Sequence, residues 1–384
     1  GEAMAMGERT PLAVLDAPAS GRMAIGEAIT NIAAADVAGL GDVRLSANWM
    51  AACGQPGEDA ALYDTVRAVG EELCPALGIA IPVGKDSLSM RSGWNEGGVE
   101  RAVTAPVSLI VSAFAPVVDV RRTLTPELAR EPGPTVLLLL DLGAGRDRLG
   151  GSGLAQVYGR LGDETPDLDD PARLRGLFAA VRELARGGRL LAYHDRSDGG
   201  LAIAALEMAF AARLGVELDL GDAARPVAAL YGEELGALLQ VREPDLPAAL
   251  EACRRHGLGG MARVVGRVMP DARFTVRHRG AVLIDEPLFA LREAWSETSW
   301  QMQRLRDHPD CADEEQAARL EPDDPGLSWR LGFDPDEDVA APFIATGRRP
   351  RVGVLREQGV NSQMAMAAAL DRAGFQPVDV HMTD

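Results

Sequence analysis

A carboxylate and a carboxamide lie four residues apart in a segment with the pattern of a helix. Ser20 is predicted to be the N-cap of this helix, because apolar residues follow it at helical spacing. Glu27 and Asn31 would then face the same side, one turn from each other. Their side-chain oxygens could hold a hard cation such as Mg²⁺. An exposed polar pair is the commoner meaning of this spacing, so both interpretations stay open.

A second candidate site is the run H-D-R-S-D-G-G (194–200), between an expected strand and an expected helix. Asp195 could bind a metal and Ser197 a phosphate, since the start of a helix favours anions and the glycines let a ligand approach the backbone. The alternative is a capped turn in which Ser197 or Asp198 is the helix N-cap. His194, Asp195 and Ser197 are sequence neighbours, which excludes a hydrolase triad geometry.

Glycine-rich turns provide weaker candidates. Lys85 follows Gly84 after an expected strand at Ile79–Val83, but Gly78 and Gly84 enclose five residues and Asp86 stands where a Walker A loop has Ser or Thr. Lys85 is therefore a weak candidate for nucleotide binding in another frame. The loop 143–153 has no G-x-G-x-x-G in register, so a dinucleotide fold is not supported, and its second half predicts a tight helix entry.

The four cysteines suggest neither a zinc site nor a disulfide framework. They are widely separated, form no C-x-x-C pair, and none has the G-x-C-x-G context of a nucleophile on a strand-to-helix turn. A reducing, cytoplasmic compartment is the simpler assumption. The residues concerned are Cys53, Cys74, Cys253 and Cys311.

Strand and helix patterns divide the chain into four parts. The first, 1–124, begins with an expected strand at Leu12–Leu15 and contains the helix with Glu27. Strands alternate with helices over 134–295, which indicates an α/β domain. Acidic residues and prolines dominate 296–349, a predicted linker. The last part, 350–384, reads as one βα unit opening a further α/β domain.

Composition limits the function classes. The chain has 384 residues and a formal net charge of −18, with 47% hydrophobic and 25% charged residues. These values are typical of folded proteins and argue against a general binder of nucleic acid or acidic membranes. The longest apolar run is only a strand's length, well below the roughly 20 residues of a membrane span. The chain begins and ends within patterned sequence and has no initiator Met, which suggests a fragment.

Several motifs in order resemble one family. They are G-E-A-M-A-M-G-E-R-T-P (1–11), G-E-A-I-T-N-I-A (26–33), L-S-A-N-W-M-A-A (45–52), I-P-V-G-K-D-S-L-S-M (81–90), L-G-G-S-G-L-A-Q (149–156), H-D-R-S-D-G-G-L (194–201), W-Q-M-Q-R-L-R-D (300–307) and R-E-Q-G-V-N-S-Q (356–363). The chain closely resembles the large, single-chain formylglycinamide ribonucleotide amidotransferases (phosphoribosylformylglycinamidine synthases). The resemblance covers essentially the whole chain.

The resemblance implies a mixed α/β (α+β) fold. Residues 1–124 would be part of a synthetase N-terminal-type, ATPase-like domain, and 134–295 a synthetase C-terminal-type α/β domain, together an aminoimidazole ribonucleotide synthetase-like unit. After the acidic linker at 296–349, residues 350–384 would start a flavodoxin-like class I glutamine amidotransferase domain. The exposed edges of Leu12–Leu15 and Val352–Leu355 would lack their sheet partners.

The resemblance also implies a function. The family is a cytoplasmic ligase of purine biosynthesis that uses ATP and glutamine to convert formylglycinamide ribonucleotide into the formylglycinamidine. Its synthetase part is an internal duplication, and this chain resembles the second repeat, which holds a structural ADP with Mg²⁺. Glu27, Asn31 and Asp195 would bind Mg²⁺, and Ser197 the nucleotide, although one acidic ligand would lie upstream.

No catalytic residue of the family falls on this chain, because the synthetase His would lie upstream and the glutaminase Cys downstream. The preceding repeat and the rest of the glutaminase would be its partners, and nucleic acid and membranes would not. Two alternatives stay open: a non-catalytic, nucleotide-stabilised scaffold, and another ATP-using enzyme of the same two-domain fold. The start of a glutaminase domain argues against the second.

Overall fold

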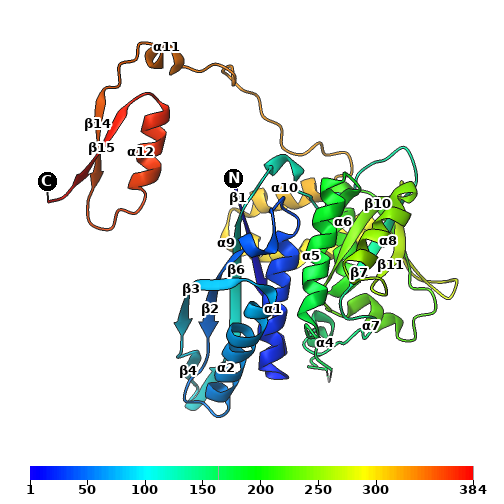
Figure 1. Ribbon diagram of the computed structural model, residues 1–384. Helices are drawn as coiled ribbons and strands as arrows, with labels where there is room; N and C mark the ends of the chain where they lie inside the picture. Colours follow the sequence, from blue (N-terminus) through cyan, green and yellow to red (C-terminus); the bar gives the residue numbers. More distant parts are fainter. Residues whose placement is uncertain (163, 384) are drawn as a thin grey trace. The chain divides into compact units, whose positions relative to one another are not determined.

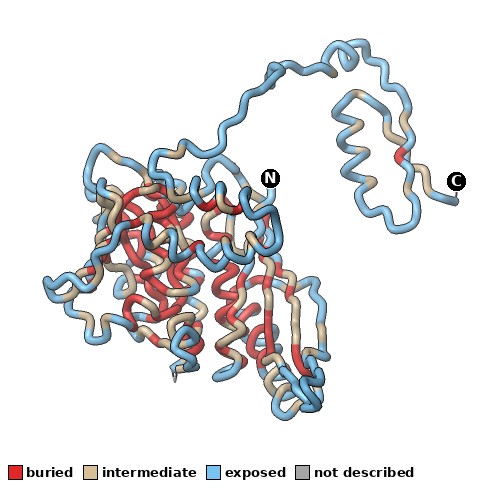
Figure 2. Tube along the Cα trace, turned by 180° about the vertical axis from the view of Figure 1, so that it is seen from behind, coloured by how far each residue is buried: buried red, intermediate tan, exposed pale blue. Residues whose placement is uncertain are grey.

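Two units make up the chain, Gly1–Pro322 and Asp323–Asp384. The computed structural model describes residues 1–162 and 164–383 (Figure 1). Buried residues concentrate in the first unit, whereas almost all of the second is exposed (Figure 2). In the described residues, no helix combines the length and the hydropathy needed to cross a bilayer.

A four-stranded sheet with helices on one face forms the N-terminal part of the first unit. Its strand order is β1-β6-β2-β3, parallel only between β2 and β3. Alternate residues of β1, β6 and β2 point towards α1 and are buried or half-buried, while Met4, Met6, Val83 and Phe114 on the other face are exposed. The bounds are β1 Glu2–Glu8, β2 Arg44–Met50, β3 Ala80–Ser87, β6 Ser108–Pro116, α1 Ala17–Ile32 and α2 Glu58–Arg67.

Two local predictions for this part are wrong. Leu12–Leu15 is not a strand: Thr10–Val14 is a 3₁₀ helix with Pro11 in its first turn, and only Leu12 of the apolar run is buried. The N-cap of α1 is Asp16 rather than Ser20, because Asp16 Oδ1 accepts a hydrogen bond from the Ala19 N–H at 2.9 Å. Ser20 lies inside the helix and donates to the carbonyl of Arg9.

The remaining elements of this part are short. After α2 the helix widens to a π-helix over Ala68–Leu73 and resumes as α3, Cys74–Leu77. The wide turn lies directly before Pro75, whose ring would clash with a carbonyl four residues earlier in a regular helix. A separate hairpin, β4 Arg91–Glu96 with β5 Val99–Thr104, is exposed along its whole length.

A seven-stranded sheet forms the second part, as the α/β pattern predicts. Its order is β13-β12-β9-β11-β7-β10-β8. β7 carries four consecutive buried leucines that alternate between two cores, one shared with α5, α8 and α1 and the other with α6. The strands are β7 Thr135–Asp141, β8 Leu190–Asp195, β9 Gly215–Asp219, β10 Gly236–Arg242, β11 Ala262–Met269, β12 Arg273–His278 and β13 Ala281–Pro287; the helices are α4 Gly153–Val157, α5 Pro171–Arg186, α6 Gly200–Ala212, α7 Pro226–Tyr231 and α8 Leu246–Arg255.

The segment predicted as an acidic linker, 296–349, is helical at its start. α9 (Leu288–Arg306) and α10 (Pro309–Leu320) pack on each other, and the Ser296 hydroxyl and the Gln316 amide hydrogen-bond between them where both are buried. Acidic residues are compatible with a helix when they lie on its exposed side and its other side packs against a neighbouring helix. Irregular chain therefore begins only at Glu321 and is interrupted by α11, Ala341–Ile344.

The second unit contains the predicted βα arrangement. β14 (Arg351–Arg356) and β15 (Gln376–His381) pair in parallel, and α12 (Gln363–Arg372) connects them. Within β14, Val354 is buried and Leu355 is exposed. A parallel pair joined by a helix is the repeating step of a doubly wound sheet.

Candidate functional site

Helix α1 presents Glu27 and Asn31 to the edge strand β1. The Glu8 N–H donates to Glu27 Oε2 at 2.7 Å, and Asn31 Nδ2 donates to the Met6 carbonyl at 3.0 Å. Gly7 permits this close approach, since a Cβ there would lie 2.1 Å from the carbonyl oxygen of Ala24. The predicted pairing on one helix face is therefore present, and both side chains are fixed by backbone groups of the neighbouring strand.

Asp195, the last residue of β8, lies close enough to Glu27 that its charge raises the pKa of the Glu27 carboxyl. Asp195 is buried, and its Oδ2 has no hydrogen-bond partner among the described residues. His194 Nδ1 lies 3.5 Å from Asp195 Oδ1, and His194 Nε2 lies 2.9 Å from Glu207 Oε2. Burial lowers the pKa of His194, but its bonds to Asp195 and Glu207 outweigh burial and raise the pKa to about 10.

Arg9 lies at the centre of the cluster and is only 3% exposed. Its guanidinium contacts Glu27 Oε1 at 3.3 Å, Asp198 Oδ1 at 2.9 Å and Glu233 Oε2 at 3.5 Å. These three carboxylates come from α1, from the loop after β8 and from the segment before β10. Arg9 therefore connects the domain of the four-stranded sheet to the domain of the seven-stranded sheet at the candidate site.

Glu233 connects two glycine turns to the same cluster. Its Oε1 accepts from the backbone N–H groups of Gly153 and Gly199, each at 2.8 Å. Burial raises the pKa of Glu233, against the effect of these two donors and of Arg9. The turn at the start of α4, predicted as a tight helix entry and capped by Ser152, is thus tied to the turn at the start of α6.

The cluster carries more negative charge than Arg9 balances. The pKa of Glu27 is raised to about 7, mainly by burial and further by Asp195 and Asp198, although Arg9 and the Glu8 N–H lower it. A carboxyl held in this way gains from any additional cation nearby. The site is therefore electrostatically suited to a bound cation.

Ser197 lies in the loop between Asp195 and helix α6. The structure contradicts the capped-turn alternative, because the N-cap is Gly199, in the left-handed region at φ +76°, and no side chain caps the helix. Gly200 has φ +66°, and a Cβ there would lie 2.8 Å from the carbonyls of Leu230 and Gly232. The N–H groups of Gly199 and Gly200 are bound by Glu233 Oε1 and by the Ser197 carbonyl, so an anion near Ser197 would use the N–H groups that follow them in the first turn of α6.

Arg196, in the same motif, is a structural residue. It is 1% exposed, and its guanidinium bonds to Asp141 Oδ1 and to the carbonyl of Glu234 at 2.5 and 2.7 Å. Glu234 in turn accepts two bonds of 2.7 Å from Arg148. This buried network holds the backbone of the Asp195–Ser197 loop against the sheet.

Arg9 and Glu233 belong to the cluster although neither is among the site residues predicted from the sequence. Arg9 is separated from Asp198 by 189 residues and from Glu233 by 224. The only available signal was a pair of glutamates, Glu233 and Glu234, directly before a strongly apolar strand. Adjacent acids beside a buried strand are exceptional unless they are paired.

The residues present fit Mg²⁺ on the condition that other oxygens complete its coordination. No group of three His, Cys, Asp or Glu side chains in the described part of the chain could hold a metal by itself. Two carboxylates, Glu27 and Asp195, and the amide oxygen of Asn31 would contribute part of a shell. This matches the habit of Mg²⁺, which uses one or two carboxylates together with waters and substrate phosphates.

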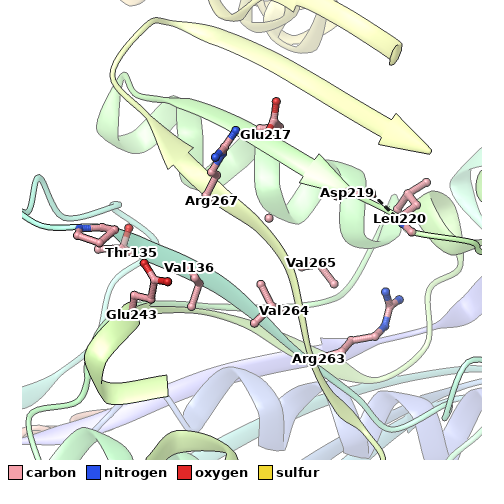
Figure 3. A pocket seen from close by; sticks show the side chains of 13 residues that line it. Thr135, Val136, Glu217, Asp219, Leu220, Glu243, Arg263, Val264, Val265 and Arg267 are labelled. Atoms are coloured by element: carbon pink, nitrogen blue, oxygen red, sulfur yellow. Dashed lines mark hydrogen bonds and ion pairs between the residues drawn. The ribbon is translucent and has the colours of Figure 1, made fainter. Parts of the chain in front are cut away.

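Lys85 is not brought to this cluster. It lies on β3, at the opposite edge of the sheet from β1, three strand spacings or about 14 Å away. It is also on the face turned away from α1, as its register partner Asn48 shows. A separate hollow of about 680 Å³ on the seven-stranded sheet, lined by Glu217, Arg263 and Arg267 among others (Figure 3), contains none of the predicted site residues.

Comparisons with known proteins give three consecutive family matches. Residues 1–116 match the FGAR-AT PurM_N-like domain, 131–279 the C-terminal domain of AIR synthase related proteins, and 349–384 the CobB/CobQ-like glutamine amidotransferase domain. In this order, the three matched domains support a fragment of a formylglycinamide ribonucleotide amidotransferase. The fold predicted from the resemblance, a synthetase-like unit followed by a glutamine amidotransferase-like portion, is confirmed.

Solved structures share the fold of this chain. PurL of Thermotoga maritima in complex with FGAR matches with a TM-score of 0.58 and 16% identity over 76% of this chain and 45% of that one. PurLQS from the same organism matches with a TM-score of 0.57 and 16% identity, over 88% and 48%. Escherichia coli HypE matches with a TM-score of 0.53 and 18% identity, over 75% and 85%. This chain thus spans about half of the Thermotoga chains, and PurL has also been solved with ATP.

Proposed function

We propose that this chain is part of an ATP- and glutamine-dependent ligase that converts formylglycinamide ribonucleotide into formylglycinamidine ribonucleotide in cytoplasmic purine biosynthesis. Within that enzyme it is the part that holds an auxiliary ADP with Mg²⁺. Glu27, Asn31 and Asp195 contact the metal, and Ser197 contacts the nucleotide. The order of the three matched domains supports the ligase assignment.

The observation that carries the auxiliary site is the buried Asp195 Oδ2, which has no hydrogen-bond partner within the described part of the chain and lies near a Glu27 whose pKa is raised to about 7. A buried carboxylate oxygen in this condition is costly unless a cation or donor reaches it. Glu27, Asn31 and Asp195 would hold Mg²⁺, which would supply positive charge to offset the carboxylates and the phosphates of a bound nucleotide. The protein's own part is to orient the oxygens: β1 holds Glu27 and Asn31, and His194 holds Asp195.

The start of α6 supports a phosphate at the same place. The Ser197 hydroxyl is a donor, and no side chain in the described residues forms an N-cap hydrogen bond to α6, although the N–H groups of Gly199 and Gly200 are already bound by Glu233 Oε1 and by the Ser197 carbonyl. Helix N-termini without side-chain caps bind anions through their free N–H groups. A metal ligand, Asp195, and a phosphate donor, Ser197, are therefore supplied by positions two residues apart.

The proposed partners follow from two features, the exposed face of the four-stranded sheet and the β14-α12-β15 unit. The face of the four-stranded sheet opposite α1 exposes Met4, Met6 and Phe114, an apolar surface suited to a preceding synthetase repeat. The β14-α12-β15 unit is suited to continuation by the remainder of a glutaminase domain. The catalytic groups belong to those partners, so we expect no glutamine-dependent turnover from this chain alone.

The test is to denature the purified chain and to measure released ADP and Mg²⁺ by chromatography and metal analysis. We expect near-stoichiometric ADP from the wild type and a large loss from Asp195→Asn. Asp222→Asn is the matched control, because it makes the same exchange at an exposed position after β9, outside the cluster. Calorimetric titration with ADP and Mg²⁺ covers the case in which nucleotide is lost on purification. No binding in either experiment, or equal binding by the two variants, would overturn the auxiliary site.

A second candidate has one observation in its favour. HypE is matched over 85% of its length, as expected if the chain were another ATP-using enzyme of the same two-domain fold. The match of 349–384 to a glutamine amidotransferase domain favours the ligase. ATP hydrolysis by the isolated chain at enzymatic rates would favour the alternative, whereas retained, unhydrolysed ADP would favour an auxiliary or scaffold role.

A further inference from the structure

The basic residues of this chain are almost all arginine. Of 39 basic residues, 38 are Arg and one, Lys85, is Lys. Arginine occupies exposed positions, helix C-termini and buried ion pairs alike, for example Arg121, Arg255 and Arg196. A position that needs only a positive charge therefore carries Arg in this protein. Position 85 is the exception, which indicates a requirement that a guanidinium does not meet.

An ammonium differs from a guanidinium in size and donor geometry. It is a compact point charge with three rotatable donors, whereas the guanidinium is a wide, planar fork that favours bidentate pairing. A ligand group enclosed among short polar side chains can be reached by the first and blocked by the second. Phosphate groups are commonly bound by lysine in this way, as a point charge.

The backbone fixes the position of Lys85. Gly84 lies so close to β2 that a Cβ would be 2.3 Å from the carbonyl oxygen of Ala47. In the parallel register Lys85 is opposite Asn48, and both lie on the face away from α1. Ser87, two residues on, shares this face, and Lys85 Nζ donates to its Oγ at 3.0 Å.

The charge of Lys85 is not balanced by an acid. No ion pair of Lys85 exists within residues 1–162 and 164–383, in a chain of net charge −18, and its ammonium donates to the neutral hydroxyl of Ser87. Beside it, the amide oxygen of Asn48 is buried without a hydrogen-bond partner among the described residues. An ammonium without an acidic partner and an amide oxygen without a hydrogen bond in the described residues therefore lie at paired positions of neighbouring strands.

We propose that Lys85, Ser87 and Asn48 form a second anion site, separate from the Glu27–Asp195 cluster, for the phosphate monoester of a sugar phosphate. Lys85 and Ser87 donate to the phosphate, and the Asn48 amide contacts the adjoining polar group of the ligand. The site is on the opposite face and the opposite edge of the four-stranded sheet from Glu27. The choice of a sugar phosphate rests on the proposed function; the anion site itself rests on the geometry.

The single lysine makes the test direct. Growth on lysine labelled with ¹³C at the ε-carbon gives one side-chain resonance, which is followed during titration with ribose 5-phosphate. We expect a saturable shift and weaker binding of ribose 5-sulfate. Calorimetry should show binding about tenfold weaker for Lys85→Arg, in line with loss of a charge-assisted contact. Arg91→Lys, an exposed exchange in the neighbouring hairpin, is the control and should bind as the wild type does.

The outcomes separate this inference from the proposed function. A linear shift that never saturates, or unchanged affinity in Lys85→Arg, would overturn the site at Lys85. Equal melting temperatures of wild type and Lys85→Arg exclude misfolding as the cause of a loss, and Ser87→Ala and Asn48→Ala should each weaken binding several-fold. Released ADP with no ribose 5-phosphate binding would contradict this inference alone, whereas the reverse result would contradict the auxiliary nucleotide site alone.

Discussion

Glu27→Gln is expected to stabilise the metal-free protein at alkaline pH, although it removes a charge from an ion pair. The pKa of Glu27 is raised from its ordinary 4.5 to about 7, first by burial and then by Asp195 and Asp198, against the opposing effect of Arg9. The folded state therefore holds the proton more tightly than the unfolded state. Stability contributed by this group is present below pH 4.5 and is lost as the pH rises through 7.

The size of the effect follows from the two pKa values. Their difference corresponds to a destabilisation of about 3 kcal/mol by about pH 8, and of less than about 1 kcal/mol near pH 5. Glutamine is neutral at both pH values, and its Oε1 can still accept from the Glu8 N–H. The variant should therefore gain up to about this amount at the higher pH and little at the lower.

Urea unfolding in EDTA, followed by tryptophan fluorescence at the two pH values, measures the change. Glu297→Gln, at an exposed position of α9, serves as the control and should be neutral throughout. Adding Mg²⁺ with ADP should reverse the order of wild type and Glu27→Gln, because the wild-type carboxylate then has a counter-ion. A Glu27→Gln variant destabilised equally at both pH values would refute the electrostatic reasoning.

Three further predictions concern the same framework. Arg9→Met leaves the buried Glu27 and Glu233 without their cation and should lower the free energy of unfolding by about 3–5 kcal/mol, less in acid, as measured by denaturant titration. Gly200→Ala should destabilise by at least about 1–3 kcal/mol, since φ is +66° and the new Cβ would meet two carbonyls, whereas Gly41→Ala meets nothing within 4 Å; equal melting temperatures would contradict this. Iodoacetamide on the native protein should label exposed Cys311 first, with peptide mass spectrometry as the readout, because burial raises the pKa to about 11 in Cys74 and Cys253.

Local sequence signals predicted the elements with strong periodicity. The leucine run of β7 and the helix with Glu27 and Asn31 were predicted because their residues carry the pattern themselves. The strand predicted at Leu12–Leu15 is wrong because four apolar residues are too few to distinguish a strand from a 3₁₀ helix with a proline in its first turn. Asp16 and Ser20 are both good caps, and only the position of Pro18 at the start of the helix favours Asp16.

The candidate site was predictable only in part. Glu27, Asn31 and Asp195 were named from spacing and motif, but the contacts of Arg9 depend on which loops the two sheets bring together. Its partners lie 189 and 224 residues away, and no local pattern encodes that distance. Arg196 shows the converse: its motif suggests a ligand contact, whereas the fold buries it as a support for the loop.

The fixed contact between α1 and β1 has a kinetic consequence. Glu27 and Asn31 are each held by a backbone group of β1, and Gly7 brings strand and helix into direct contact. A side chain that is immobilised only on binding costs about 0.5–1.5 kcal/mol of affinity, and here that ordering precedes the ligand. Ligand association at this face would then need no rearrangement of the protein, so the association rate should be set by diffusion and charge. Differences in affinity between related ligands should therefore arise from their dissociation rates.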